Sequence, residues 1–229
     1  MSLHTTVIAK APVAGRVKTR LCPPCSFERA AAIAATALAE TIEAIDTITD
    51  IAATRRTLLL DGAVQAWMPS EYAVVEQRGD DLGERLRNGF ADLGPGVVIG
   101  METPHVAHLL GDALHLVERG VDVIGLADDG GYWMIGLCAA TVRKADEVFR
   151  DVPMSTSTTG GLQLQRLRDL GARVEMLPTA RDLDTIDDLL AIADSGRSGG
   201  LAALARETID ALISAGAWTP PASAGRLPS

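Results

Sequence analysis

Short apolar runs alternate with longer helical patterns along most of the chain, and this alternation constrains the fold more than any other feature. The runs, rich in Val, Ile and Leu, lie at 3–9, 56–61, 72–77, 96–100, 121–127, 132–137 and 173–177. The helical patterns lie at 26–48, 81–92, 104–119, 141–149, 157–170 and 185–194. Apolar strands that alternate with helices are typical of a mostly parallel sheet covered on both sides. The sequence therefore predicts an α/β fold with a mostly parallel central sheet and helices on both faces.

Composition along the chain predicts one large domain followed by a short C-terminal part. The 229 residues, 47% of them apolar, are sufficient for a substantial core. We expect one domain over 1–194, a linker and a C-terminal helix over 195–216, and a disordered Pro- and Ser-rich tail over 217–229.

The net charge argues against nucleic acid as a partner. A formal charge of −9 leaves no broad basic surface for a phosphate backbone. Every apolar stretch is broken before the ~18 residues that span a bilayer, and the first 20 residues lack a signal-peptide pattern. We therefore expect a cytoplasmic protein that binds neither nucleic acid nor membrane, and we make no prediction of its oligomeric state.

A basic loop joins the first predicted strand to the first predicted helix. No Asp or Glu occurs in 1–27. A loop that leads into a helix is a favourable anion site, and Gly15 would let the backbone turn close to a ligand. The pattern matches neither the Walker motif nor the dinucleotide fingerprint, so a phosphate site and a solvated basic loop both remain open. The candidate phosphate ligands are Lys10, Arg16, Lys18 and Arg20.

Two predicted strands run directly into acidic residues. Glu102 follows the strand at 96–100, and Asp129 follows the strand at 121–127. Ligands of open α/β sheets bind at the carboxyl ends of strands, and Mg²⁺ takes carboxylate oxygens there. We expect Glu102 and Asp129 to hold a divalent cation, Mg²⁺ or Mn²⁺, from neighbouring strands, with helix capping as the alternative role.

Two glycines and a capping pattern accompany these acids. Gly130 and Gly131 permit a backbone turn against a ligand. The spacing of Asp81 and Glu84 in "RGDDLGER" predicts a capping box at the start of a helix. That helix start could also face a nucleotide.

A Cys-x-x-Cys pair, Cys22 and Cys25, raises a redox alternative. At the start of a helix, the dipole can lower a thiol pKa. The remaining chain does not read as a thioredoxin-like domain, and three cysteines supply neither a disulfide framework nor a four-ligand zinc site. A redox function of this pair is therefore less favoured than a function based on the basic loop and the two acids.

Six segments carry a resemblance to a known family. They are "AKAPVAGRVKTRL" (9–21), "QRGDDLGERL" (77–86), "GMETP" (100–104), "LADDGGYWMIGL" (126–137), "MSTSTT" (154–159) and "RDLDTIDDL" (181–189). In this order they resemble the bacterial selenodomain-associated or arsenosugar-biosynthesis-type transferases. That family has the glycosyltransferase-A fold of the nucleotide-diphospho-sugar transferase superfamily. The resemblance covers about residues 6–190.

The resemblance implies roles for individual residues. Around the nucleotide diphosphate it places Lys10, Gly15, Lys18 and Arg20, and near the nucleoside it places Gln77, Gly79, Leu82 and Gly83. It places Asp129, Gly130 and Gly131 opposite the metal or the acceptor. It also places Asp182, Asp184 and Thr185 in a late turn that closes the site. The chain departs from the family's Gly-x-Asp-x-Pro at Glu102, whose longer side chain moves the carboxylate outward.

Together these features predict a transferase that moves a glycosyl or nucleotidyl group from a nucleotide sugar or nucleoside triphosphate to a small acceptor. Asp129 and Lys18 are the expected catalytic residues, because such chemistry depends on positioning and on charge stabilisation at the diphosphate. The alternative is a non-catalytic nucleotide-binding or regulatory protein whose metal site has drifted at Glu102.

Overall fold

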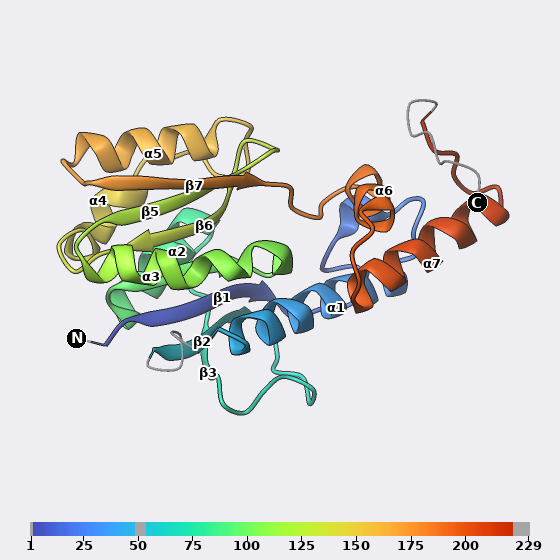
Figure 1. Cartoon of the computed structure of the whole chain (residues 1–229), viewed down its shortest axis with the longest axis horizontal. Coiled ribbons are helices and arrows are strands. Elements are labelled where there is room, and N and C mark those ends of the chain that lie inside the picture. Colours follow the sequence, from blue (N-terminus) through green and yellow to red (C-terminus); the bar gives the residue numbers. More distant parts are fainter. Residues whose placement is uncertain (1, 49–53, 222–229) are drawn as a thin grey trace. The chain divides into compact units, whose positions relative to one another are not determined.

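The chain folds into two compact units, seen in a computed structural model that describes residues 2–48 and 54–221 (Figure 1). The sheet unit consists of Met1–Ala11 and Thr41–Asp182, and the helical unit consists of Pro12–Glu40 and Leu183–Ser229. One long helix, α1 (Phe27–Asp46), begins in the helical unit and ends in the sheet unit. Each unit is therefore built from two separate stretches of the chain.

The sheet unit contains one seven-stranded sheet in the order β3-β2-β1-β4-β6-β5-β7. The strands are β1 (His4–Lys10), β2 (Arg55–Asp61), β3 (Ala73–Glu76), β4 (Gly96–Gly100), β5 (Asp122–Ala127), β6 (Tyr132–Leu137) and β7 (Val174–Ala180). All neighbouring pairs are parallel except those of β6, which runs antiparallel to β4 and β5. The mostly parallel sheet is confirmed.

The direction of β6 follows from the length of the turn before it. Only residues 128–131 separate β5 from β6. A parallel return needs a crossover of a dozen or more residues, so this connection can only form an antiparallel hairpin. β6 therefore pairs with β5, and its other edge pairs with β4.

Helices cover both faces of this sheet. On one face, α2 (Leu82–Leu93), α4 (Ala145–Phe149) and α5 (Thr159–Asp169) share a buried cluster with β4 and β6. On the other face, Val117 of α3 (Leu110–Glu118) packs where Gly136 of β6 leaves room, because a Cβ at Gly136 would approach the Val117 side chain to 3.0 Å. The predicted three-layer arrangement is confirmed.

The predicted helices differ in detail from those observed. The pattern at 104–119 divides into a 3-10 helix, η3 (Pro104–Leu109), and α3, and the pattern at 141–149 divides into η4 (Val142–Lys144) and α4. β7 continues to Ala180 through Pro178. Proline is tolerated there because β7 lies at an edge of the sheet.

The helical unit has its own apolar core. It contains η1 (Thr19–Leu21), the first part of α1, α6 (Ile186–Asp194) and α7 (Gly200–Ser214). Leu21 and Ile33 pack with Leu189 and Ile209 in a single buried cluster. α6 therefore packs with α7 in one unit, whereas the composition of the sequence placed a domain boundary between them, at residue 194. Of the tail expected to be disordered, residues 222–229 lie outside the described part.

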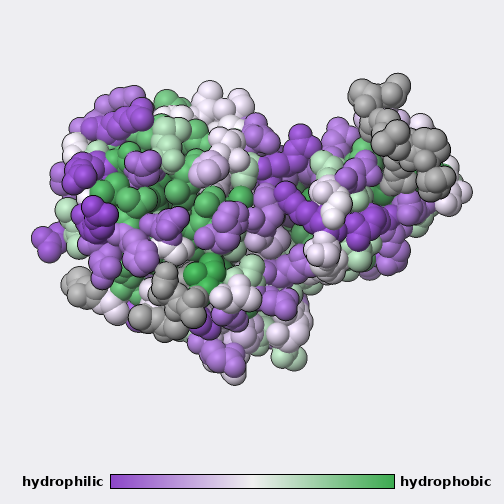
Figure 2. All heavy atoms as spheres, viewed as in Figure 1, coloured by the Kyte–Doolittle hydropathy of each residue, from purple (hydrophilic) through white to green (hydrophobic). Residues whose placement is uncertain are grey.

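The surface is mixed in polarity. On the face shown in Figure 2, hydrophilic side chains are interspersed with apolar ones, and the apolar ones gather over the sheet unit. Among the described helices, none combines the length and the hydropathy needed to cross a bilayer.

A buried histidine begins β1. The His4 side chain is fully buried, its ring nitrogens lie 2.8 Å from Thr6 Oγ1 and 3.1 Å from Gly94 O, and its ring lies 5.5 Å from that of Phe90. Burial lowers the pKa of His4 from 6.5 to about 4, the hydrogen bond to Gly94 opposes this shift, and the nearby Arg55 charge adds to it. The neutral ring is therefore the form that the fold accommodates.

We expect His4 to make the protein less stable as the pH falls from about 6.5 to about 4. In that pH range His4 is protonated in the unfolded chain but stays neutral in the folded chain. The free energy of unfolding therefore falls by up to about 3 kcal/mol. Urea unfolding of the wild type and His4→Gln at a series of pH values measures this loss. The variant should be less stable at pH 7 and should lack this part of the pH dependence. An equal pH dependence in both proteins would contradict the assignment, and His115→Gln, at an exposed histidine, is the control.

Candidate functional site at the carboxyl edge of the sheet

The parallel strands of the sheet unit all end at one edge, called here the carboxyl edge. The antiparallel β6 begins at this edge. In the order of the strands, the residues at or just beyond the edge are Gln77, Asp61, Lys10, Glu102, Tyr132, Asp129 and Arg181. In open α/β sheets this edge is where ligands bind.

Glu102 and Asp129 both lie at the carboxyl edge, but the expectation that they come from neighbouring strands is wrong. They follow β4 and β5, and β6 separates these two strands. With strands ~4.8 Å apart, the two strand ends are about 10 Å from each other. A shared cation would therefore need both side chains to reach across the start of β6.

The turn that carries Asp129 is fixed by its own hydrogen bonds. Asp129 Oδ1 accepts from the Gly131 amide at 2.8 Å, and the Gly130 amide donates to Ala127 O at 3.0 Å. Gly131 O in turn accepts from the Ala127 amide at 3.0 Å. One carboxylate oxygen of Asp129 is thus held inside the turn, and this sets the direction of the whole group.

The same turn is locked against the start of α5. The Gly160 amide donates to Gly130 O at 2.8 Å. Gly130 has φ +89°, and a Cβ there would lie 1.9 Å from Ser157 O. Gly160 is also closely packed, because a Cβ there would lie 2.3 Å from Gly131 O. The sequence segments "LADDGGYWMIGL" and "MSTSTT" therefore meet backbone to backbone.

The start of α2 confirms the predicted cap. Asp81 Oδ1 accepts from the Glu84 amide at 2.9 Å. Glu84 Oε2 accepts from the Asp80 amide at 2.9 Å, so the return bond reaches one residue before the cap. Gly79, with φ +129°, allows this close packing, since a Cβ there would lie 2.5 Å from that of Glu84.

The α2 start also meets the two segments just described. Met154 packs so closely on Gly83 that a Cβ at Gly83 would lie 2.9 Å from Met154 Cε. The Tyr132 hydroxyl lies 3.9 Å from Met154 Sδ. Burial of this hydroxyl, and secondly the Asp81 charge, raise the pKa of Tyr132, which therefore stays protonated. Leu82 is 37% exposed and remains accessible at the helix start.

Gln77 is more constrained than the sequence indicated. Its Nε2 donates to Ala9 O at 2.7 Å and to Leu59 O at 2.9 Å. Its Oε1 accepts from Arg85 Nη1 at 3.3 Å. Both side-chain amide protons are thus bonded to backbone carbonyls of β1 and β2.

Sequence reasoning missed Asp61 and Arg85, which complete this network. Arg85 Nη1 donates to Asp61 Oδ2 at 3.0 Å, and Arg85 Nε donates to Gly79 O at 3.1 Å. Two signals were present: Asp61 ends a predicted strand, and Arg85 follows the cap Asp81 by one helical turn.

In the helical unit, the structure brings together three of the residues that the resemblance singled out. Lys18 Nζ donates to Leu183 O and lies 3.3 Å from Asp184 Oδ1. Arg20 Nη1 lies 2.6 Å from Asp184 Oδ2. The Lys18 side chain is only 3% exposed, whereas that of Arg20 is 66% exposed. Lys18 therefore ties the basic loop to the 183–184 turn.

The other members of the basic loop lie in the open. Arg16 is exposed, and Gly15 has φ +76° with no atom within 4 Å of its Cβ position. Lys10, at the end of β1 in the sheet unit, is also exposed. Thr185 caps α6, and with Asp188 it forms a capping box that sequence reasoning did not identify.

The thiol pKa values of Cys22 and Cys25 are raised, so the suggested lowering by the helix start is wrong. Burial is the main cause for both residues. The Glu28 charge adds to the shift at Cys22, and Cys22 adds to it at Cys25 more than Arg29 opposes it. Both cysteines are free, and a raised pKa leaves less of the reactive thiolate at neutral pH. The structure thus gives no support to the redox alternative.

The expected metal site has ligands of the right type, but the described part of the protein alone supplies too few of them. Within residues 2–48 and 54–221, no three His, Cys, Asp or Glu side chains form a cluster that could hold a metal ion. Two carboxylates nevertheless suit Mg²⁺, which commonly takes one or two and completes its shell with phosphate oxygens and water. Such a site would be completed by the ligand that brings the phosphates.

The chain resembles known proteins in sequence and in fold. A family model described as "Uncharacterized protein conserved in bacteria (DUF2064)" matches residues 35–156. Among curated proteins, no sequence matches.

Two solved structures share the fold. One is a candidate nucleotide-diphospho-sugar transferase from Desulfovibrio desulfuricans G20, with a TM-score of 0.80 and 24% identity over 94% of this chain and 98% of that one. The other is CMP:2-keto-3-deoxy-manno-octonic acid synthetase complexed with CTP, with a TM-score of 0.53 and 10% identity over 90% of this chain and 100% of that one. The expected nucleotide-diphospho-sugar transferase fold is thus confirmed.

Proposed function

The chain belongs to the bacterial DUF2064 family, and we propose that it is a transferase that uses a nucleotide-activated donor. The observation that carries the proposal is the fixed turn of Asp129, Gly130 and Gly131 at the carboxyl edge of a nucleotide-diphospho-sugar transferase fold. A carboxylate whose direction is set before the ligand arrives suits chemistry that depends on positioning. The CTP complex of the similarly folded synthetase supports a nucleotide as the ligand.

Within the sheet unit, we assign the carboxylates of Asp129 and Glu102 to a divalent cation, Mg²⁺ or Mn²⁺. When bound, this cation would neutralise charge on the donor's diphosphate. The Gly131 amide orients Asp129 by its hydrogen bond. Leu82 offers an accessible contact for the nucleoside at the start of α2, whose backbone is fixed by close packing at Gly79 and Gly83.

The side chains of the basic loop receive phosphate roles according to their burial. Arg16 and Arg20 of the helical unit and Lys10 of the sheet unit have exposed cationic groups that can contact an anion directly. Lys18 instead holds the loop in shape through Leu183 O and Asp184, and a phosphate would have to compete with Asp184 for its ammonium. The donor that the protein accepts determines whether a glycosyl or a nucleotidyl group is transferred to the small acceptor.

We expect a nucleotide donor to raise the melting temperature of the full chain when Mg²⁺ or Mn²⁺ is present. A ligand at a hundred times its Kd stabilises by about 2.7 kcal/mol. At ~2–4 °C per kcal/mol for a chain of this size, the shift is about 5–10 °C. Thermal unfolding with nucleoside diphosphates, nucleoside triphosphates and sugar nucleotides, with and without each metal, measures it.

The outcomes of this screen are distinct. A shift that needs both nucleotide and metal, followed by product formation with that nucleotide, supports the proposal. No shift with any nucleotide would overturn it. A shift without turnover on any acceptor would favour the nucleotide-binding, non-catalytic alternative.

A further inference from the structure

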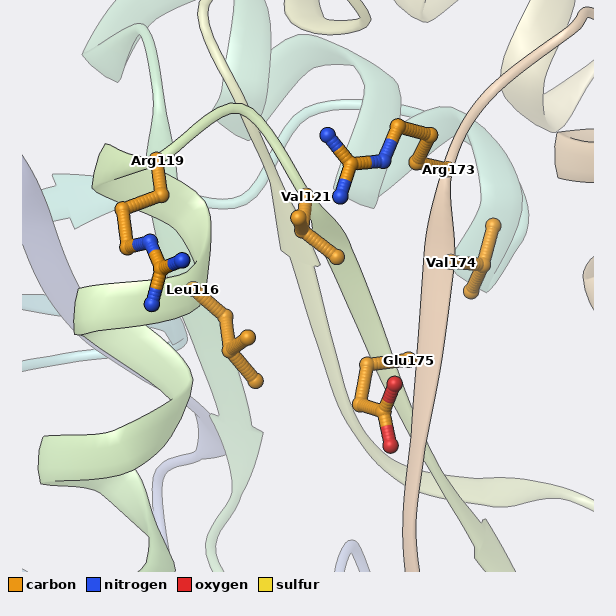
Figure 3. A pocket seen from close by; sticks show the side chains of 6 residues that line it. All are labelled: Leu116, Arg119, Val121, Arg173, Val174 and Glu175. Carbon is orange, nitrogen blue, oxygen red and sulfur yellow. The ribbon is translucent and has the colours of Figure 1, made fainter.

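One hollow of the sheet unit lies away from the carboxyl edge. It has a volume of about 230 Å³ and lies between the end of α3 and the amino ends of β5 and β7 (Figure 3). Its lining residues are Leu116, Arg119, Val121, Arg173, Val174 and Glu175. Because β5 is six residues long, roughly 20 Å of strand separates this hollow from the turn of Asp129.

The lining combines an apolar surface with excess positive charge. Figure 3 shows Arg173, just before β7, reaching toward Val121, Arg119 lying beside Leu116, and Glu175 farther along β7. Two guanidinium groups and one carboxylate thus line the hollow, in a chain whose formal charge is −9.

Unlike five other arginines of the sheet unit, the two arginines of the hollow form no ion pair within the described part of the chain. Arg56, Arg78 and Arg85 each form an ion pair with an aspartate. Within the described residues, no side-chain hydrogen bond or ion pair involves Arg119 or Arg173. Their donors therefore remain available to a ligand, and guanidinium groups bind carboxylate and phosphate oxygens in pairs.

The backbone around the hollow is fixed. The Val121 amide donates to Leu116 O at 3.0 Å, and the Asp122 amide donates to Arg173 O at 2.8 Å. The buried Asp122 carboxylate accepts from the Cys138 amide at 2.7 Å and from Thr141 Oγ1 at 2.6 Å. A ligand would therefore meet a frame that needs little ordering, which favours binding.

We propose that this hollow binds a small organic anion, with its phosphate or carboxylate between Arg119 and Arg173 and its apolar part on Leu116, Val121 and Val174. The volume lies below the ~300–1,000 Å³ of sites for drug-sized ligands, so the ligand is small. The apolar lining distinguishes it from a site for inorganic phosphate alone. This binding goes beyond the proposed transferase function and does not depend on it.

Phenyl phosphate and benzoate are the probes, since they join an apolar ring to a phosphate or to a carboxylate. Amide chemical shifts of the ¹⁵N-labelled full chain, followed during titration, should show saturable changes around the hollow with a Kd at or below about 1 mM. Inorganic phosphate should bind at least about fivefold more weakly than phenyl phosphate, because it gains nothing from the apolar lining. The stronger of the two probes identifies the anionic group.

Three variants separate a site from general charge attraction. Arg119→Ala/Arg173→Ala should weaken binding of the better probe at least about tenfold. Arg143→Ala/Arg150→Ala removes the same charge from exposed positions outside the hollow and should leave the Kd unchanged. Glu175→Gln should tighten binding about two- to fivefold, because a like charge is removed.

The proposal is overturned if neither probe saturates, or if the two double variants weaken binding equally. The residues changed are exposed, and the melting temperature of each variant verifies that it is folded. A nucleotide titration of the Arg119→Ala/Arg173→Ala protein separates the two proposals, because donor binding at the carboxyl edge should be unaltered.

Discussion

Asp129→Asn is expected to lower turnover about a thousandfold, measured with the donor and acceptor that the nucleotide screen identifies. The change removes the negative charge proposed to hold the cation beside the donor's diphosphate, and the loss of one such group typically costs ~10²–10³ in rate. The asparagine oxygen can still accept from the Gly131 amide, so the turn should keep its shape. The melting temperature without ligand should therefore remain within a few degrees of the wild type.

The neighbouring acid provides the matched control. Asp128 is exposed, and its carboxylate lies 3.9 Å from Arg181 Nε. Asp128→Asn makes the same chemical change one residue away and should retain most of the activity. If Asp129→Asn kept more than about a tenth of the wild-type rate, or if both variants lost equally, the assignment to Asp129 would be wrong.

Gly130→Ala is expected to destabilise the protein by about 3 kcal/mol or more. A positive φ costs a non-glycine residue ~1–2 kcal/mol by itself. The added Cβ would also lie 1.9 Å from Ser157 O, so either the turn or the start of α5 must move. Urea unfolding of the full chain measures the change, and turnover should fall with it because Asp129 is displaced.

Gly161 offers a control in the same region of the chain. It lies within α5, and no atom lies within 4 Å of its Cβ position. Gly161→Ala should be neutral or should stabilise by up to about 1 kcal/mol, since alanine is the better helix former. Equal stability of Gly130→Ala and the wild type would mean that the turn is not held against α5 as described.

The strands and helices could be predicted because apolar runs and helical periodicity are local signals. The direction and place of β6 could not be read from the same pattern, because an apolar run does not record which way a strand points. The four-residue connection at 128–131 does determine the direction of β6 and its pairing with β5, but not its pairing with β4. Because β6 pairs with both β4 and β5, the expectation that Glu102 and Asp129 follow neighbouring strands is wrong.

Burial and pairing at the candidate site depend on residues far away in the chain. Lys18 and Arg20 read as equivalent members of one basic loop, but Leu183 and Asp184 bury the first and leave the second exposed. Gln77 likewise read as a nucleoside contact, and its amide protons are used by backbone carbonyls of β1 and β2. At Cys22 and Cys25, burial outweighs the helix start, and sequence position alone does not reveal burial.

The course of α1 limits how this architecture can be divided. Because the helix starts in one unit and ends in the other, neither unit corresponds to a continuous piece of the chain. A fragment that ends at Asp182 would retain every strand, yet it would leave Leu21, Ile33 and Ala37 without their partners from α6 and α7. The helical unit therefore cannot be exchanged as one continuous segment, because both of its stretches must be kept together.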